Sequence, residues 1–164
     1  NLITKNSTAI LKMYENAILR KERNKDFWYL GKPYKVIFDN RVTKIDFYED
    51  TITCENEDAL NKFYSEECER VFKEEIDICK KCFSTLPEFY LKIRKMKTRW
   101  GVCNTRDKII TLNSELLKKD ISLIDYVIIH ELSHFFEPNH SKNFWALVAT
   151  AIPDYKERRK KLRY

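Results

Sequence analysis

All three histidines of this 164-residue chain lie in one short segment, and they constrain the local fold more than any other feature of the sequence. The segment runs from His130 to His140 and begins with the pattern His-Glu-x-x-His, in which the second histidine is His134. Residues i and i+4 of an α-helix share a face, so these two rings can reach one point in space. The preceding residues are almost wholly apolar. We therefore predict a buried helix over residues 121–136 that holds both rings at the inner edge of a cleft.

The residues after His134 predict a reversal of the chain. Pro138 disfavours helical geometry at Glu137, and Asn139 tolerates left-handed backbone. We expect regular helix to stop just after His134 and the chain to double back, which brings His140 within reach as a third ligand. Carboxylate oxygens remain alternatives for that third position, namely those of Glu137, Asp154 and Glu157.

Three imidazole ligands leave the fourth position of a zinc ion to water, as in catalytic zinc sites, whereas structural sites are usually closed by four protein ligands. His130, His134 and His140 are thus the expected zinc ligands. Glu131 is the expected catalytic base, which takes a proton from the zinc-bound water as that water attacks a carbonyl. The alternative interpretation is a histidine pair satisfied in the core without metal, beside a surface carboxylate.

Composition excludes several other classes of protein. The chain contains only two glycines, too few for a Walker A loop or a dinucleotide fingerprint. No run of about 18 apolar residues is present, so we expect no membrane partner. The length and the 43% hydrophobic content predict a single globular domain over residues 1–164.

Charge and cysteine content bear on partners and on the compartment. The net charge is +6, and part of it lies in the basic run 156–163, for which a solvated helix and a nucleic-acid contact are alternative interpretations. The five cysteines are odd in number and follow no secretion signal, which favours reduced thiols and a cytoplasmic location. For Cys79 and Cys82, reduced thiols are favoured over a zinc or redox site because no second cysteine pair accompanies them.

Periodicity predicts a mixed α+β chain. Helical spacing is expected over residues 7–23, 56–83 and 121–136, with a shorter helix from Ser141. Short strand-like pieces at 27–30, 34–38, 42–47 and 51–54 are separated by turn residues and predict a small meander. Further strands are expected over 89–94 and 108–112.

Several separate blocks of sequence resemble the YgjP-like metallopeptidase domain family, which is related to the WLM and SprT-like zincins. These blocks occur in the family's order and are Lys97-Thr98-Arg99-Trp100-Gly101-Val102-Cys103, Leu112-Asn113, the segment Asp125 to His134, and Asn139-His140-Ser141 with Phe144-Trp145. The histidine spacing is also similar to that of the metzincins. However, that motif has glycine at the position of Glu137 and a methionine turn downstream, whereas Met13 and Met96 both lie upstream.

The resemblance implies a zincin-like fold, with a small β-sheet packed against helices, and a metal-dependent hydrolase. It carries the metal-ligand role to His130, His134 and His140, and the catalytic role to Glu131. It also implies that a natural N-terminal segment precedes the chain seen here. Some relatives are described as nucleotide pyrophosphatases, so the resemblance leaves the substrate open.

We therefore expect a zinc metallopeptidase that cleaves a peptide or protein substrate. A zinc-dependent nucleotide pyrophosphatase and a basic nucleic-acid-associated module with little catalysis are the alternatives. Arg99 and Tyr155 are candidates for stabilising the oxyanion, with a surface arginine and a packed tyrosine as the competing interpretations. Asn113 and Asn139 are candidates for orienting a ligand ring.

Overall fold

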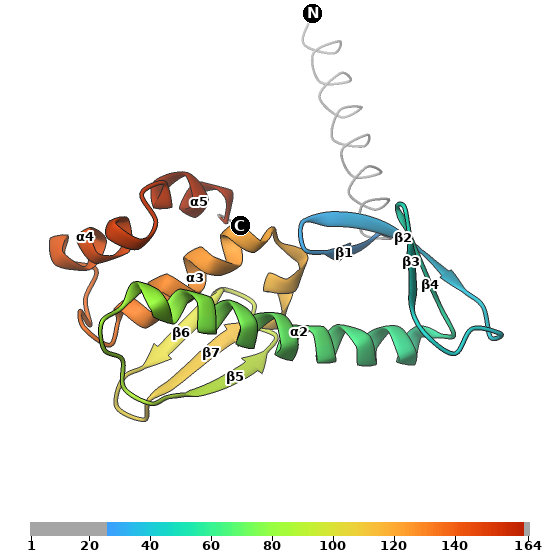
Figure 1. Cartoon of the computed structure of the whole chain (residues 1–164), viewed down its shortest axis with the longest axis horizontal. Helices are drawn as coiled ribbons and strands as arrows, with labels where there is room; N and C mark the ends of the chain where they lie inside the picture. The colour runs from blue at the N-terminus through green and yellow to red at the C-terminus, as the bar shows by residue number, and fades with distance from the viewer. Residues whose placement is uncertain (1–25, 163–164) are drawn as a thin grey trace, which may run out of the picture.

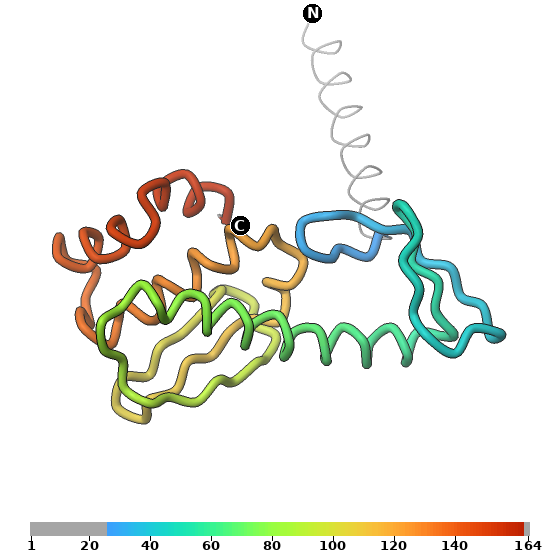
Figure 2. Tube along the Cα trace, viewed as in Figure 1, coloured from blue at the N-terminus to red at the C-terminus, as the bar shows by residue number. Residues whose placement is uncertain are grey.

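The computed structural model describes residues 26–162, and the helix expected over residues 7–23 lies outside them. Two small sheets lie at opposite ends of a long helix, with the other helices gathered around one of them (Figures 1 and 2). This architecture confirms the expected α+β class. None of the helices in the described region is long and apolar enough to cross a membrane.

The first sheet contains β1 (Phe27–Tyr29), β2 (Lys32–Phe38), β3 (Asp46–Tyr48) and β4 (Thr51–Cys54), in the order β1-β2-β4-β3. The predicted meander is wrong, because β2 and β4 pair in parallel and β3 lies outside them. Burial explains this order. Ile52 and Cys54 of β4 are completely buried, whereas all of β3 is exposed, so β4 takes the central position.

Helix α2 (Glu57–Cys79) connects the two ends of the molecule. It begins where the Asn56 side chain accepts a hydrogen bond from the amide of Ala59, and a short 3-10 turn, η1 (Lys80–Cys82), follows it. Leu60 packs in a small apolar cluster with Ile52. Later apolar residues of α2, from Cys68 onward, belong to the main core.

The second sheet contains β5 (Tyr90–Arg94), β6 (Gly101–Asn104) and β7 (Ile109–Asn113), in the order β5-β7-β6. Strands β5 and β7 are parallel, and β6 runs antiparallel to β7. The sequence predicted strands at the positions of β5 and β7, but none at the position of β6. That strand is therefore an addition, and it forms an edge of the sheet.

The remaining elements are η2 (Ser114–Lys118), α3 (Ile121–Ser133), α4 (Lys142–Ala151) and α5 (Tyr155–Lys161). Helix α3 lies at the centre, in contact with α2, α4, α5 and β6. Its apolar residues explain this position, because Ile124, Ile128 and Leu132 are completely buried. One face of α3 packs against β6, and the candidate site lies between this face and the strand.

Candidate active site

Helix α3 and the turn after it bring the three histidines together. His130 and Glu131 lie in the last turn of the helix, and His134 is its C-terminal cap. The amide of Glu137 donates to the carbonyl of Ser133, and the chain then reverses through Pro138. As predicted, the reversal returns His140 to the other two rings.

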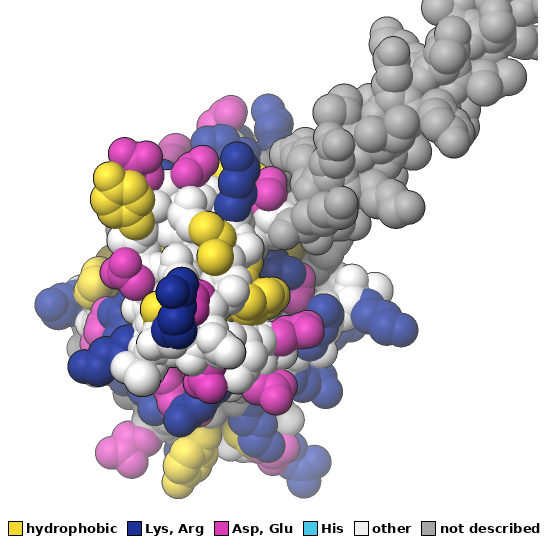
Figure 3. Space-filling model, turned by 90° about the vertical axis from the view of Figure 1, so that its right-hand side faces the viewer, with side chains coloured by type: hydrophobic (Ala, Val, Ile, Leu, Met, Phe, Trp, Pro, Cys, Tyr) yellow, Lys and Arg dark blue, Asp and Glu magenta, His cyan; other side chains and the backbone are white. Residues whose placement is uncertain are grey.

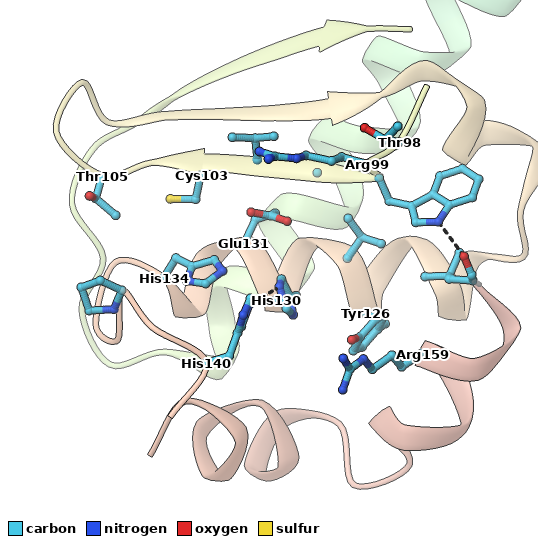
Figure 4. A pocket seen from close by; sticks show the side chains of 16 residues that line it. Thr98, Arg99, Cys103, Thr105, Tyr126, His130, Glu131, His134, His140 and Arg159 are labelled. Carbon is cyan, nitrogen blue, oxygen red and sulfur yellow. Dashed lines mark hydrogen bonds between the residues drawn. The ribbon is translucent and has the colours of Figure 1, made fainter. Parts of the chain in front are cut away.

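The three imidazoles form a group suited to one metal ion. One ring nitrogen from each histidine lies within 4.8 Å of the others, and Nε2 of His130 is 3.0 Å from Nε2 of His140 (Figure 4). Nδ1 of His134 lies 3.2 Å from the Glu137 carbonyl oxygen, a contact that would leave Nε2 for the cluster. Within residues 26–162, no acidic side chain joins this group, so Glu137, Asp154 and Glu157 are not among its members.

The electrostatics of the cluster suit a cation. Burial, followed by the proximity of His134, His140 and Arg159, lowers the pKa of His130 to about 3. Burial also lowers the pKa of His140, with smaller contributions from His134 and Arg159. Both rings are therefore neutral near pH 7, and neutral imidazole is the form that binds metal. Geometry and protonation together fit a divalent ion that accepts nitrogen ligands.

Aromatic residues of α4 support the histidines from below. The ring of Phe144, which is completely buried, lies 4.6–4.9 Å from all three imidazole centroids. Trp145 stacks on His140. Tyr155 in turn stacks on Trp145, with 5.2 Å between the two ring centres. Tyr155 thus reaches the histidines only through Trp145, and it is not among the residues that line the cleft.

Glu131 is placed beside the histidines by close packing against β6. Its side chain is only 6% exposed, and a Cβ atom at Gly101 would lie 2.6 Å from its Cγ and 2.7 Å from its Oε1. Burial raises the pKa of Glu131 to about 8, and the Cys103 backbone amide and the Arg99 charge oppose this rise. Glycine at position 101 is therefore the residue that makes room for the carboxylate.

A cleft of about 660 Å³ lies above the histidines and Glu131. Figure 4 shows Arg99 on the β6 side of the cleft and Arg159 with Tyr126 on the opposite side. Sequence reasoning missed Tyr126 and Arg159. Tyr126 precedes His130 by four residues, so helical spacing alone could have placed it on this face. Arg159 belongs to the basic run 156–163, in which no residue stands out from its neighbours by sequence alone. In the structure its guanidinium lies 4.8 Å from the centre of the Trp145 ring.

Other residues singled out from the sequence lie around this cleft. The Asn113 side chain is completely buried, accepts from the amides of Met96 and Glu115, and donates to the carbonyls of Met96 and Arg99. It therefore holds the loop that carries Arg99. The Asn139 carbonyl accepts a hydrogen bond from the Ser141 amide within the turn.

The cysteines are free thiols, as expected. Burial and the proximity of Glu131 raise the pKa of Cys103, which lines the cleft, to about 12. Its thiol is therefore protonated at neutral pH and offers no preformed thiolate to a metal. Cys79 and Cys82 belong to no group of three metal-binding side chains within the described residues.

Comparison with solved structures identifies two metallopeptidase zymogens with a similar fold. Abylysin from Pyrococcus abyssi matches with a TM-score of 0.52 and 23% identity, over 56% of this chain and 90% of its own. Jannalysin from Methanocaldococcus jannaschii matches with a TM-score of 0.50 and 22% identity, over 56% of this chain and 92% of its own. At these identities the likeness concerns the fold. No curated protein sequence matches the chain.

The family comparison covers the whole chain. Residues 1–164 match the family described as "YgjP-like, metallopeptidase domain". This agrees with the blocks of sequence that carry the resemblance and with a histidine group that could hold a metal ion. The chain belongs to the YgjP-like family of metallopeptidase domains.

Proposed function

We propose that this protein is a zinc-dependent metallopeptidase with a zincin-like fold. The observation that carries the proposal is the group of three imidazole nitrogens within 4.8 Å of one another, next to the buried carboxylate of Glu131. Nitrogen ligands from three histidines favour zinc over harder cations such as Mg²⁺ and Ca²⁺, which prefer oxygen. The free cysteines support a cytoplasmic location.

The metal and Glu131 would divide the chemistry between them. When bound, zinc supplies a Lewis acid that acidifies a water molecule and polarises the substrate carbonyl. Glu131 accepts the proton of the attacking water and returns it to the leaving amine nitrogen. Glu131 acts as a base in its ionised form, which a bound dication would favour against the effect of burial on the pKa of Glu131.

The residues that face Glu131 and the histidines supply positive charge and hydrogen-bond donors. Arg99 acts electrostatically on Glu131, and Arg159 acts on His130 from the opposite side. Arg99 is our candidate for stabilising the oxyanion, together with Arg159 or Tyr126 from the other wall. Tyr155, stacked on Trp145, is placed to orient His140 through the indole rather than to contact substrate.

Strand β6 favours a peptide over a phosphoanhydride as the substrate. It is an edge of its sheet and lines the cleft through Gly101, Val102 and Cys103. An edge strand offers main-chain hydrogen bonds to an extended peptide. Among the described residues, no acidic group suitable for Mg²⁺ accompanies the histidines, which disfavours the nucleotide alternative.

Replacement of Glu131 by Gln tests this function. The variant should retain about one zinc per chain, measured by elemental analysis, and lose peptide hydrolysis by about 10²–10⁴-fold because the proton acceptor is gone. His134→Ala should lose the metal and serves as the comparison. The same preparations are assayed against a nucleoside triphosphate. Glu131-dependent release of pyrophosphate without peptide cleavage would replace the peptidase by the nucleotide alternative.

A further inference from the structure

A second cavity, of about 440 Å³, adjoins the active-site cleft. The two cavities share Thr98, Arg99 and Val102 in their walls. The second one is formed by Arg94 at the end of β5, by the loop that follows over residues 95–99, and by Val102 of β6. An extended chain lying in the cleft along β6 would therefore continue directly over this loop.

The combined lining of the two cavities is strongly basic. It contains a single acidic residue, the Glu131 already assigned to catalysis, against the cations Arg94, Lys95, Lys97, Arg99 and Arg159. Lys95 forms an ion pair with Glu115 at 3.4 Å. Arg94, Lys97 and Arg99 are exposed, and within residues 26–162 none of them forms a salt bridge with a carboxylate. Their charges are therefore available to a ligand.

The charge on α2 and at the far end of the molecule is arranged differently. On α2, the cations Lys62, Arg70 and Lys73 each pair with a carboxylate three or four residues away. At the far end of the molecule, basic and acidic side chains are interspersed (Figure 3). Other cations of the described residues, such as Lys92 and Lys108, also form no ion pair. What sets this surface apart is that three unpaired cations line one cavity beside the cleft.

We propose that this basic extension selects peptide substrates with Asp or Glu residues on one side of the scissile bond. The proposal rests on the proposed peptidase function and specifies its substrate class. The carboxylates of such a segment would lie over Arg94, Lys97 and Arg99, while its backbone pairs with β6. Three exposed cations facing an acidic segment give complementary charge, and no unpaired ion has to be buried.

The edge strand favours an acidic peptide over a nucleic acid at this surface. A strand edge recognises a peptide backbone, whereas nucleic-acid grooves combine cations with aromatic side chains on which bases stack. The second cavity is lined by cations, Met96, Thr98 and Val102 and contains no aromatic residue. A single-stranded oligonucleotide is therefore the rival probe in the test.

The test measures binding to the Glu131→Gln variant of the whole 164-residue chain, with and without zinc, by fluorescence anisotropy. The probes are a labelled decapeptide with three Asp or Glu residues, its Asn/Gln counterpart with the same label, and a labelled oligonucleotide. Each exposed ion pair strengthens binding by a factor of about two to five, so the acidic peptide should bind about tenfold more tightly than the neutral one. This preference should shrink above about 0.15 M salt and persist without zinc.

Charge-reversal variants of Arg94 and Lys97 test whether the preference for the acidic peptide arises at this surface. Arg94→Glu and Lys97→Glu should each weaken binding of the acidic peptide about fivefold or more and leave the neutral peptide unchanged. Lys35→Glu, on an exposed position of β2, changes net charge equally and is the matched control. Equal effects of all three variants, equal binding of both peptides, or tighter binding of the oligonucleotide would each overturn the proposal.

Hydrolysis by the zinc-loaded protein with Glu131 intact separates this inference from the proposed function. We expect the acidic peptide to be cleaved with a higher kcat/KM, and Lys97→Glu to reduce that advantage. If neither peptide is cleaved but the binding preference and its loss in Lys97→Glu remain, the peptidase assignment fails and the acidic-segment site stands. If both are cleaved equally, the specificity proposal fails and the peptidase assignment stands.

Discussion

At the scale of single residues, the position of Glu131 depends on the absence of a side chain at Gly101. The carboxylate occupies the space that a Cβ atom would take, and it does so while nearly completely buried. Displacement of a reacting group by about 1 Å can cost about 10²-fold in rate, since the reacting atoms must be aligned. Gly101 is thus a positioning residue for the proposed catalytic base.

Gly101→Ala should reduce kcat for peptide hydrolysis by about 10²-fold and leave the zinc content unchanged, because the new methyl group displaces Glu131 but not the histidines. The measurement is steady-state kinetics beside elemental analysis. Cys103→Ala removes atoms from the same strand and should keep most of the activity. Full activity of Gly101→Ala would show that Glu131 is not held in its working position by this contact.

At the scale of elements, helix α4 controls the metal site through one ring. Phe144→Ala should weaken zinc binding measured by chelator competition, because all three imidazoles lose the ring against which they pack, and should lower the free energy of unfolding by about 3–5 kcal/mol. Val148→Ala, one turn further along and equally buried, is the matched control. If both variants lose zinc affinity equally, the loss reflects reduced stability of the fold and not the contact of Phe144 with the imidazoles.

The contact between α2 and α3 contains a second pH-sensitive feature, away from the histidines. Burial, followed by a hydrogen bond and repulsion with Glu75, raises the pKa of Asp125 from 3.8 to about 7, while Arg158 opposes the shift and Asp120 adds to it. Asp125 Oδ1 is buried and has no hydrogen-bond partner among the described residues. The folded chain therefore favours the protonated carboxyl, and ionising it costs stability.

The sign of the pH dependence follows from the raised pKa. The contribution of Asp125 is fully present below about pH 4 and is lost as the pH rises through about 7. The free energy of unfolding of Asp125→Asn should thus exceed that of the parent protein by about 1–3 kcal/mol at pH 8, and by less at pH 5. Urea unfolding at both pH values measures this, and Asp46→Asn on exposed β3 is the control. A difference that does not grow with pH would contradict the assignment.

At the scale of the whole molecule, two separate apolar clusters contribute to the stability of the fold. The smaller cluster holds the first sheet against the start of α2, and the larger one surrounds α3 and the candidate site. Backbone hydrogen bonds from Leu30 to Leu117 and from Gly31 to Lys118 connect the β1–β2 turn to η2. The first sheet is therefore attached to the body that carries the histidines but contributes no residue to the cleft.

Ile52→Ala should lower the free energy of unfolding by about 2–5 kcal/mol and leave zinc affinity within about twofold, because the cavity opens in the smaller cluster. Ile110→Ala, in the larger cluster, should affect both quantities. Urea unfolding and chelator competition on the two variants provide the comparison. Loss of zinc binding in Ile52→Ala would show that the two clusters behave as one unit.

Much of the local structure was predictable from the sequence because its causes are local. The apolar period and the His-Glu-x-x-His spacing indicate α3, and Pro138 with Asn139 indicates the reversal that returns His140. The strand order of the first sheet was not predictable in this way. Turn residues at 39–40 and 49–50 suggest consecutive pairing, whereas burial of Ile52 places β4 between β2 and β3.

The sequence by itself determined which residues could hold a metal, since helical spacing and one turn bring the three histidines together. Only the tertiary structure decided what surrounds them. The contact of Gly101 with Glu131, the packing of Phe144 against the imidazoles, and the approach of Arg159 from α5 join segments up to 30 residues apart. Such contacts depend on how β6, α4 and α5 pack on α3, and burial across the whole chain sets that packing.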